Sequence, residues 1–330
     1  MARPFTLALA GDVMLGRLVD EAIARHGFAY PWGDLLPVLH RADRVLINLE
    51  CVLTARTERW REPDGSYKAF YFRADPAVVE TLRLGRVAFA GLANNHSGDF
   101  GMEGLLDTLR ILDDAGIPHA GAGHTMAEAR RRAHLAVDGS RLAVVACADY
   151  PRAWAATPAS PGINYVPVSV DPADFAPVEQ ALAAARHDAD LVLFSIHWGP
   201  NMRARPTAEF RRFARRVVEA GADIFWGHSA HVPQGVEVYR GKPILYDTGD
   251  FVDDYAVDEE LRNDLSALFL LRVRPPAVAG LELLPVRIGR MQVNLARGAD
   301  RNWIVRRLTE LSAEFGTRVV DEPEGVSVVL

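Results

Sequence analysis

Side chains that can bind metal ions occur at the ends of several apolar segments of the sequence. Each of them ends or follows a segment whose composition predicts a buried β-strand: Asp12, Glu50, Asn95, His197 and the pair His228 and His231. Carboxylate, amide and imidazole groups without thiolates suit divalent metals such as Mn²⁺, Fe²⁺, Zn²⁺ or Mg²⁺. Ligands of open α/β sheets bind outside the carboxyl ends of the strands, so we expect these side chains to converge on a metal site.

Each residue also has a purely structural explanation. An aspartate beside a glycine turn, such as Asp12, is commonly a cap, and Asn95 could serve a turn with left-handed geometry. His197 alone could be a hydrogen-bonded core histidine, and the last two histidines could simply belong to a loop. Glu50 is harder to explain in this way, because a carboxylate that follows the apolar residues 45–49 is costly to bury unpaired. The coincidence of all these strand ends favours a site.

The elements that must position these side chains alternate through the first two thirds of the sequence. Apolar runs predict strands over residues 5–15, 44–50, 86–96, 141–150, 188–199 and 223–231. Amphipathic or capped segments predict helices over residues 17–26, 75–85, 101–116, 173–187 and 207–222. This alternation indicates an α/β fold.

The last third of the sequence is richer in β-structure. It predicts a hairpin over 235–249 with Gly241-Lys242 at its turn, strands over 266–274 and 279–289, a helix near 300–315, and short strands at 317–320 and 326–330. Together the two parts predict two packed sheets with helices outside. We expect one compact domain over residues 1–298, on which a helix-strand extension over 299–330 packs.

Composition narrows the class of protein and its surroundings. The net charge of −6 gives no reason to expect nucleic acid as a partner. The two cysteines, Cys51 and Cys147, lie in apolar runs, which is typical of reduced thiols in a cytosolic protein. We find neither a signal peptide nor an apolar run long enough for a membrane span, so we expect a soluble, cytoplasmic protein. Of 37 lysines and arginines, only Lys68 and Lys242 are lysines.

Five short motifs, in order, carry a resemblance to a known family. They are GDVMLGR (11–17), NLE (48–50), GLANNH (91–96), HWG (197–199) and GHSAH (227–231). With them the sequence resembles, over residues 5–255, the CapA family of poly-γ-glutamate capsule biosynthesis proteins, which is related to calcineurin-like metallophosphoesterases. The resemblance implies a four-layer α/β/β/α sandwich of two mixed sheets, with two divalent metal ions in a cleft at the strand ends.

The resemblance also implies a role for each motif residue. Asp12 and His231 would bind the first metal, Glu50 would bridge, and the second metal would be completed by Asn95, His197 and His228. His96 would face the leaving group as a general acid. Apart from the resemblance, Asp99 could orient His96, and Arg17, one turn past Asp12, is a candidate contact for an anionic substrate. Asp250 or Asp254 could orient a ligand histidine.

The sequence departs from the related enzymes in three places. Calcineurin-like enzymes carry Asp-x-His in the first motif, whereas this chain has Met14, so we expect the first metal to bind more weakly. Two residues, not one, separate His228 from His231, and Pro200-Asn201-Met202 follows the HWG motif in place of an acidic-aromatic pair. We therefore expect the surface that contacts the substrate to differ from that of the related enzymes at residues 200–202.

Two functions from different classes fit these observations. The first is a metal-dependent hydrolase, dinuclear, that cleaves a phosphoester or a glutamyl-type amide by metal-activated hydroxide. Its substrate would be an anionic small molecule, peptide or polymer. The second is a non-catalytic accessory protein of poly-γ-glutamate or capsule polymer synthesis, in which the cleft is only a binding site. An acid such as His96 favours the hydrolase, because a scaffold has little use for a leaving-group acid.

Overall fold

The computed structural model describes residues 3–322 and 325–330. Within these residues the larger sheet has ten strands: β1 (Phe5–Val13), β2 (Arg44–Leu49), β5 (Val87–Gly91), β6 (His119–Ala120), β15 (Asp250–Val252), β16 (Leu265–Arg274), β17 (Ala277–Gly289), β18 (Gln292–Leu295), β19 (Val319–Glu322) and β20 (Gly325–Val328). The second sheet is made of β8 (Ala133–Val137), β9 (Ser140–Ala148), β11 (Leu191–His197), β12 (Ile224–His228), β13 (Val236–Tyr239) and β14 (Lys242–Leu245). Two short strand pairs lie outside the sheets: β3 (Val52–Leu53) with β4 (Arg73–Ala74), and β7 (Ala122–Gly123) with β10 (Gly162–Ile163).

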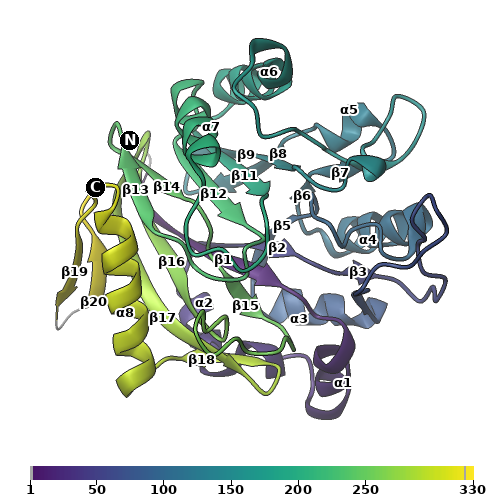
Figure 1. The fold of residues 1–330 in the computed structure, drawn as a ribbon, viewed down its shortest axis with the longest axis horizontal. Coiled ribbons are helices and arrows are strands. Elements are labelled where there is room, and N and C mark those ends of the chain that lie inside the picture. The colour runs from purple at the N-terminus through teal and green to yellow at the C-terminus, as the bar shows by residue number, and fades with distance from the viewer. Residues whose placement is uncertain (1–2, 323–324) are drawn as a thin grey trace.

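The helices connect these strands. The α-helices are α1 (Arg17–His26), α2 (Leu36–Leu39), α3 (Val79–Leu84), α4 (Gly101–Ala115), α5 (Met126–Ala129), α6 (Pro172–Asp188), α7 (Ala208–Glu219) and α8 (Gly298–Ala313). Short 3₁₀ segments occur at η1 (Tyr30–Leu35), which is kinked at Gly33, and at η2 (Pro76–Val78) and η3 (Arg152–Trp154). In Figure 1, α6 and α7 lie beyond the second sheet at the top, and α1 and α3 lie below the larger sheet.

Both sheets are mixed. The larger sheet runs in the order β19-β20-β17-β16-β1-β2-β5-β6, and β1, β2, β5 and β6 are mutually parallel, whereas β16 is antiparallel to β1. The second sheet runs β13-β14-β12-β11-β9-β8, with β9, β11, β12 and β14 parallel. The carboxyl ends of two parallel strand sets are therefore available to present polar side chains.

Alternation along the central strands produces three apolar layers. On β1, Leu7 and Leu9 pack between the two sheets, whereas Ala8 and Ala10 face the helices outside the larger sheet. On the second sheet, the outward residues of β9 and β11 pack against α6 and α7. The predicted α/β/β/α sandwich of two mixed sheets is therefore confirmed.

Some predicted boundaries differ from the observed ones. The helix expected over 75–85 is divided into η2 and α3. In the hairpin, Tyr239 pairs with Lys242, so the turn consists of Arg240 and Gly241 and not of Gly241 and Lys242. These two turn residues have φ of 52° and 73°, as a two-residue type I′ turn requires.

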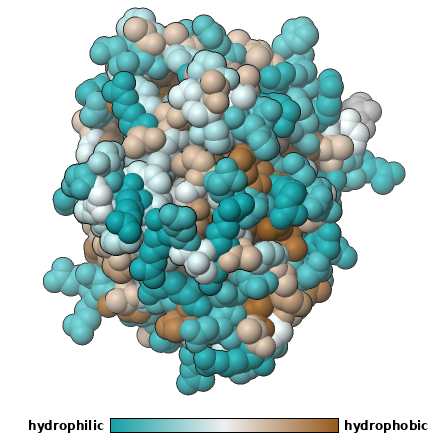
Figure 2. All heavy atoms as spheres, turned by 90° about the vertical axis from the view of Figure 1, so that its right-hand side faces the viewer, coloured by the Kyte–Doolittle hydropathy of each residue, from teal (hydrophilic) through white to brown (hydrophobic). Residues whose placement is uncertain are grey.

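The C-terminal segment packs on the same sheets. Helix α8 lies beside β13, β16 and β17, and β20 pairs with β17, beyond which β19 forms the edge of the larger sheet. The domain boundary at residue 298 stays a prediction. In the described part of the chain, no helix is both long enough and apolar enough to cross a membrane. Figure 2 shows the face at the right of Figure 1, where apolar side chains are exposed in patches among polar ones.

Candidate metal centre

Asp12 lies at the middle of the strand ends. In the larger sheet it is opposite Asn48 of β2 on one side and opposite Asp250 of β15 on the other. This close packing requires glycine at the preceding position, because a Cβ atom on Gly11 would lie 1.7 Å from the carbonyl oxygen of Gly249. The Asp12 side chain is 1% exposed, so its carboxylate depends on neighbouring protein groups for compensation.

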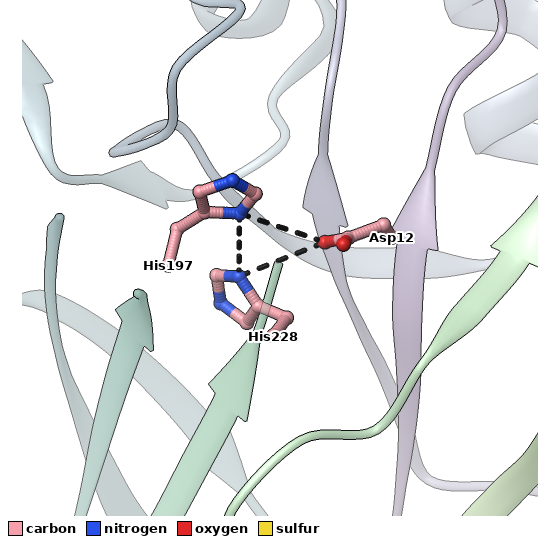
Figure 3. Close-up of side chains that lie close together, drawn as sticks. All are labelled: Asp12, His197 and His228. Carbon is pink, nitrogen blue, oxygen red and sulfur yellow. Dashed lines mark hydrogen bonds and ion pairs between the residues drawn. The ribbon is translucent and has the colours of Figure 1, made fainter. Parts of the chain in front are cut away.

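Two histidines of the second sheet meet the Asp12 carboxylate across the sandwich. His197 ends β11 and His228 ends β12, and these two residues are directly paired in the parallel ladder. Their Nδ1 atoms lie 3.7 Å and 3.6 Å from Asp12 Oδ1, and 3.1 Å from each other. Figure 3 shows the three side chains pointing toward one another. These three side chains form a first group that could hold a metal ion.

Neighbouring polar side chains fix this first group. The Asn48 amide donates to Asp12 Oδ1 at 2.7 Å and lies 3.3 Å from His197 Nδ1. The Nε2 atom of His228 lies 3.0 Å from Ser195 Oγ. Burial lowers the pKa of His228 to about 3, so its imidazole is neutral at physiological pH, which is the form that binds metals.

A second group of potential ligands shares Asp12. It consists of Asp12, Glu50, His231 and Asp250, which each offer one atom within 4.8 Å of the others. His231 Nδ1 lies 3.7 Å from Asp12 Oδ2 and 2.8 Å from Asp250 Oδ1. The distance between Glu50 Oε1 and His197 Nε2 is 3.7 Å, so Glu50 connects the second group to the first.

The loop that carries His228 and His231 has a strained backbone. Ser229 and His231 have φ of 114° and 61°, a region that non-glycine residues enter at a cost of about 1–3 kcal/mol each. The backbone N–H groups of this loop compensate by donating to carboxylates: Ser229 N to Asp12 Oδ2 at 3.1 Å, and Ala230 N to Asp247 Oδ2 at 2.8 Å. Strain held by specific contacts is typical of functional sites.

Several polar side-chain atoms, three in these two groups and one in Asn95, are buried without a hydrogen-bond partner among the described residues. They are Glu50 Oε1, Asn95 Oδ1, His197 Nε2 and Asp250 Oδ2. Leaving such acceptors unpaired costs free energy, so an additional ligand at this point would be stabilising. Burial and the neighbouring Asp12 raise the pKa of Glu50. Orphaned oxygen and nitrogen acceptors around a shared carboxylate suit divalent metal ions.

The turn after β5 holds the remaining predicted residues. Asn94 is structural, because its amide donates to the carbonyl of Leu49 at 2.9 Å and its oxygen accepts the N–H of His96. Asn95, by contrast, leaves its buried side-chain oxygen free. Neither asparagine has a positive φ, so left-handed geometry does not explain them.

His96 lies beside the two groups of potential metal ligands. Its Nδ1 lies 2.7 Å from Asp99 Oδ2 and its Nε2 lies 3.9 Å from Glu50 Oε1. The ring of Phe72 stacks on the imidazole with centroids 3.7 Å apart. Burial lowers the pKa of His96 to about 4, although the carboxylate of Asp99 acts in the opposite direction.

A cavity of about 310 Å³ opens beside His96 and His231. Its other lining residues are Arg17, Phe70, Phe72, Asn201, Met202, Tyr255, Ala256 and Asn263. Arg17 has a φ of 56°, forms an ion pair with Asp254 at 3.2 Å, and lies over the rings of Phe70 and Phe72. The cavity therefore combines one cation with an aromatic wall, next to the possible metal ligands.

Met14 is fully buried close to Asp12. Its sulfur accepts the N–H of Gly16 at 3.1 Å, which gives the thioether a local structural role. The weaker first metal site that Met14 predicts stays a prediction.

Three contributors were absent from the sequence predictions. Asn48 supports Asp12, the hydroxyl of Tyr255 donates to Glu50 Oε2 at 3.0 Å, and Lys68 forms an ion pair with Asp99. Asn48 could have been found as an amide inside an apolar strand, and Lys68 as one of only two lysines. Of the two aspartates proposed to orient a histidine, Asp250 contacts His231, whereas Asp254 pairs with Arg17.

Comparison with known proteins agrees with the motifs. The family described as "Bacterial capsule synthesis protein PGA_cap" matches residues 6–255. A "Probable polyglutamine synthesis accessory protein" of Mycobacterium tuberculosis is 34% identical over 98% of this chain and 96% of its own length. The capsule biosynthesis protein CapA of Bacillus anthracis is 30% identical over 92% of this chain and 73% of its own length. The PGA biosynthesis protein CapA of Bacillus subtilis is 28% identical, over 95% and 80%. The chain belongs to this family of bacterial capsule synthesis proteins, the CapA family.

Proposed function

We propose that this protein is a metal-dependent hydrolase that binds two divalent metal ions and cleaves a phosphoester or a glutamyl-type amide. The observation that carries the proposal is the set of unpartnered, buried acceptors that converge on Asp12 beside the His96–Asp99 pair. One metal would be held by Asp12, His197 and His228, and the other by Asp12, Glu50, His231 and Asp250. Asn95, whose buried side-chain oxygen has no partner among the described residues, would be a further ligand.

The chemistry of such ions suits hydrolysis. Bound Mn²⁺, Fe²⁺, Zn²⁺ or Mg²⁺ acidifies water and stabilises negative charge on substrate oxygens. The chain contributes the orientation of its own groups: Asn48 fixes the Asp12 carboxylate, and Asp250 fixes the His231 ring. Contacts of this kind raise metal affinity by holding the ligands in place.

His96 is the group that would transfer a proton to the leaving group. The Nδ1–H···Asp99 hydrogen bond directs Nε2 away from the turn, and His96 lines the cavity. Because burial keeps the free imidazole neutral in spite of the Asp99 carboxylate, His96 needs further negative charge nearby before it holds a proton on Nε2. An anionic substrate in the cavity would supply that charge and so prepare the acid.

The cavity favours such a substrate. Arg17 is its cationic lining residue, and the Arg17 side chain is 35% exposed despite its ion pair with Asp254. A phosphate or carboxylate of the substrate could accept hydrogen bonds from the exposed side of Arg17. The buried free thiols of Cys51 and Cys147 are in keeping with a reducing compartment, and we place the protein in the cytoplasm.

The relatives favour a second candidate function. One of them is named as a polyglutamine synthesis accessory protein and others as capsule or PGA biosynthesis proteins. The same metal groups could then serve to bind an anionic polymer without cleaving it.

A substrate screen with matched variants separates the two functions. The purified wild-type protein is reconstituted in turn with each candidate metal and assayed on aryl phosphomonoesters, phosphodiesters and γ-glutamyl anilides. The variants His228→Asn and Lys242→Met are assayed in the same way. The hydrolase proposal predicts turnover that needs metal and is lost in His228→Asn but not in Lys242→Met, whose ammonium contacts Ala222 and Asp223 on another part of the sheet. Full metal loading without turnover of any substrate would instead favour the accessory function.

A further inference from the structure

Asp99 contacts two segments that are apart in the sequence, the turn that carries His96 and the segment that carries Lys68 and Phe72. Its Oδ2 accepts hydrogen bonds from His96 Nδ1 and from the backbone N–H of Phe72, both at 2.7 Å. Its Oδ1 accepts from the ammonium group of Lys68 at 2.5 Å. The carboxylate is fully buried, so its charge needs these partners. His96 and the irregular segment 54–72 are thus joined through one side chain.

Lys68 is held in place by three contacts. Besides Asp99, its ammonium donates to the backbone carbonyl of Asn95 at 2.5 Å and lies 4.6 Å from the centre of the Trp154 ring. Only 13% of the side chain is exposed, so this is not an ordinary solvated lysine. The contact with the carbonyl of Asn95 fixes the backbone directly before His96.

The choice of lysine at this position has a geometric reason. The chain uses arginine for nearly all its cations, yet both of its lysines bridge a carboxylate and a backbone carbonyl: Lys68 as described, and Lys242 with Asp223 and Ala222. A compact ammonium can direct its donors to separate acceptors, whereas the planar guanidinium fork of arginine is suited to paired oxygens. At this position the compact ammonium of Lys68 reaches both acceptors at once.

We propose that Lys68 is a positioning residue that orients the His96 imidazole through Asp99 and the Asn95 carbonyl. This rests on the proposed role of His96 as the proton donor. The same segment carries Phe70 and Phe72, which form the aromatic wall of the cavity, and Phe72 stacks on the His96 ring. Lys68 consequently sets both the orientation of the acid and the position of the wall against which the substrate lies.

Kinetics on two kinds of substrate test this role. Lys68→Met keeps much of the chain volume but removes the ammonium group. We expect it to slow a substrate with a poor leaving group about 10–100-fold, a part of the range for general acid catalysis, and to slow a nitrophenyl substrate by a much smaller factor. Metal content should be unchanged, and the control Lys242→Met should behave as the wild type. Equal losses on both substrates, or no loss on either, would overturn the proposal.

A second readout needs neither metal nor substrate. In the metal-free protein, the Nδ1–H proton of His96 should give a downfield NMR resonance that is protected from solvent exchange and is absent in His96→Gln. We expect this resonance to be lost or broadened in Lys68→Met and retained in Lys242→Met. An unchanged resonance in Lys68→Met would contradict the proposal even if the wild type showed no hydrolysis. This separates failure of the Lys68 inference from failure of the proposed function.

A conservative variant covers the case in which Lys68→Met does not fold. Lys68→Arg keeps the positive charge beside Asp99 but not the compact shape. We expect a shifted, still protected His96 resonance and an intermediate loss on the poor leaving group. Wild-type behaviour of Lys68→Arg in both measurements would support positioning by the charge alone, whereas equal losses on both substrates would overturn the proposal.

Discussion

His231 Nδ1 lies 2.8 Å from Asp250 Oδ1, and Asp250 is the residue opposite Asp12 in the parallel pairing of β15 with β1. The GHSAH motif (227–231) is thereby connected to the GDVMLGR motif (11–17) through β15, which belongs to neither motif. This contact places the second group of potential ligands where the two sheets meet.

Replacement of Asp250 by asparagine should weaken this half of the centre. The variant keeps the shape of the side chain but loses the charge that orients and polarises the His231 ring. We expect metal affinity to fall about 10–100-fold, as is usual when such a partner is removed. Metal titration of Asp250→Asn checks this, with Asp254→Asn as control, because Asp254 pairs with Arg17 and not with a ligand histidine. Equal metal affinities of Asp250→Asn and the wild type would show that the contact between His231 and Asp250 does not contribute to metal binding.

Met14 should make the two metal sites unequal. A histidine at this position would add a ligand beside Asp12, so we expect Met14→His to tighten the weaker of two binding events in a metal titration. Met14→Leu is the matched control, since it removes the sulfur without adding a ligand and should leave both affinities unchanged. Two equally tight events in the wild-type protein would contradict the expected inequality.

Binding of metal should release protons. Burial raises the pKa of Glu50 and of Asp250, so in the metal-free protein these groups keep their protons to higher pH than exposed carboxyls do. A metal ion must displace those protons, and its apparent affinity should therefore rise as pH rises. Calorimetric titration in two buffers with different ionisation enthalpies measures the release. An observed enthalpy independent of the buffer would mean that the ligands are already deprotonated.

Replacement of His96 should slow hydrolysis by a factor that depends on the leaving group, whereas replacement of Asn95 should not show this dependence. His96→Ala should slow a poor leaving group by about 10²–10⁴-fold and a nitrophenyl substrate only modestly, because a nitrophenolate leaves without a proton. Its metal content should stay unchanged. Asn95→Ala should weaken metal binding and slow both substrates alike. Loss of metal from His96→Ala would show that His96 is itself a ligand or a structural residue.

The sequence allowed much of the fold to be predicted, for a physical reason. Buried parallel strands are continuous apolar runs, and polar residues that end them stand out, which is why Asp12, His197 and His228 could be recognised. The structure brings these three side chains together. Their adjacency across two sheets depends on the order of the strands, which no local pattern contains.

The residues that were missed are those whose position depends on distant pairing. Asn48 stands out as an amide inside β2, but only the pairing of β2 with β1 places it beside Asp12. For Asp250 the sequence predicts only the orientation of a ligand histidine, because its place opposite Asp12 depends on a three-residue strand that pairs with β1 far earlier in the chain. Lys68 belongs to a segment without helix or long strand, so no periodicity places it beside Asp99.

The metal content of Asp12 variants tests the central claim most directly. Because Asp12 belongs to both groups of ligands, we expect elemental analysis to find about two metal ions per chain in the wild type. Asp12→Asn should lose both metals together, whereas His228→Asn should chiefly lose one. Hydrolytic activity should disappear with chelation and return when metal is added. A wild-type protein that retains no metal under any loading condition, and whose activity is unaffected by chelator, would contradict the account.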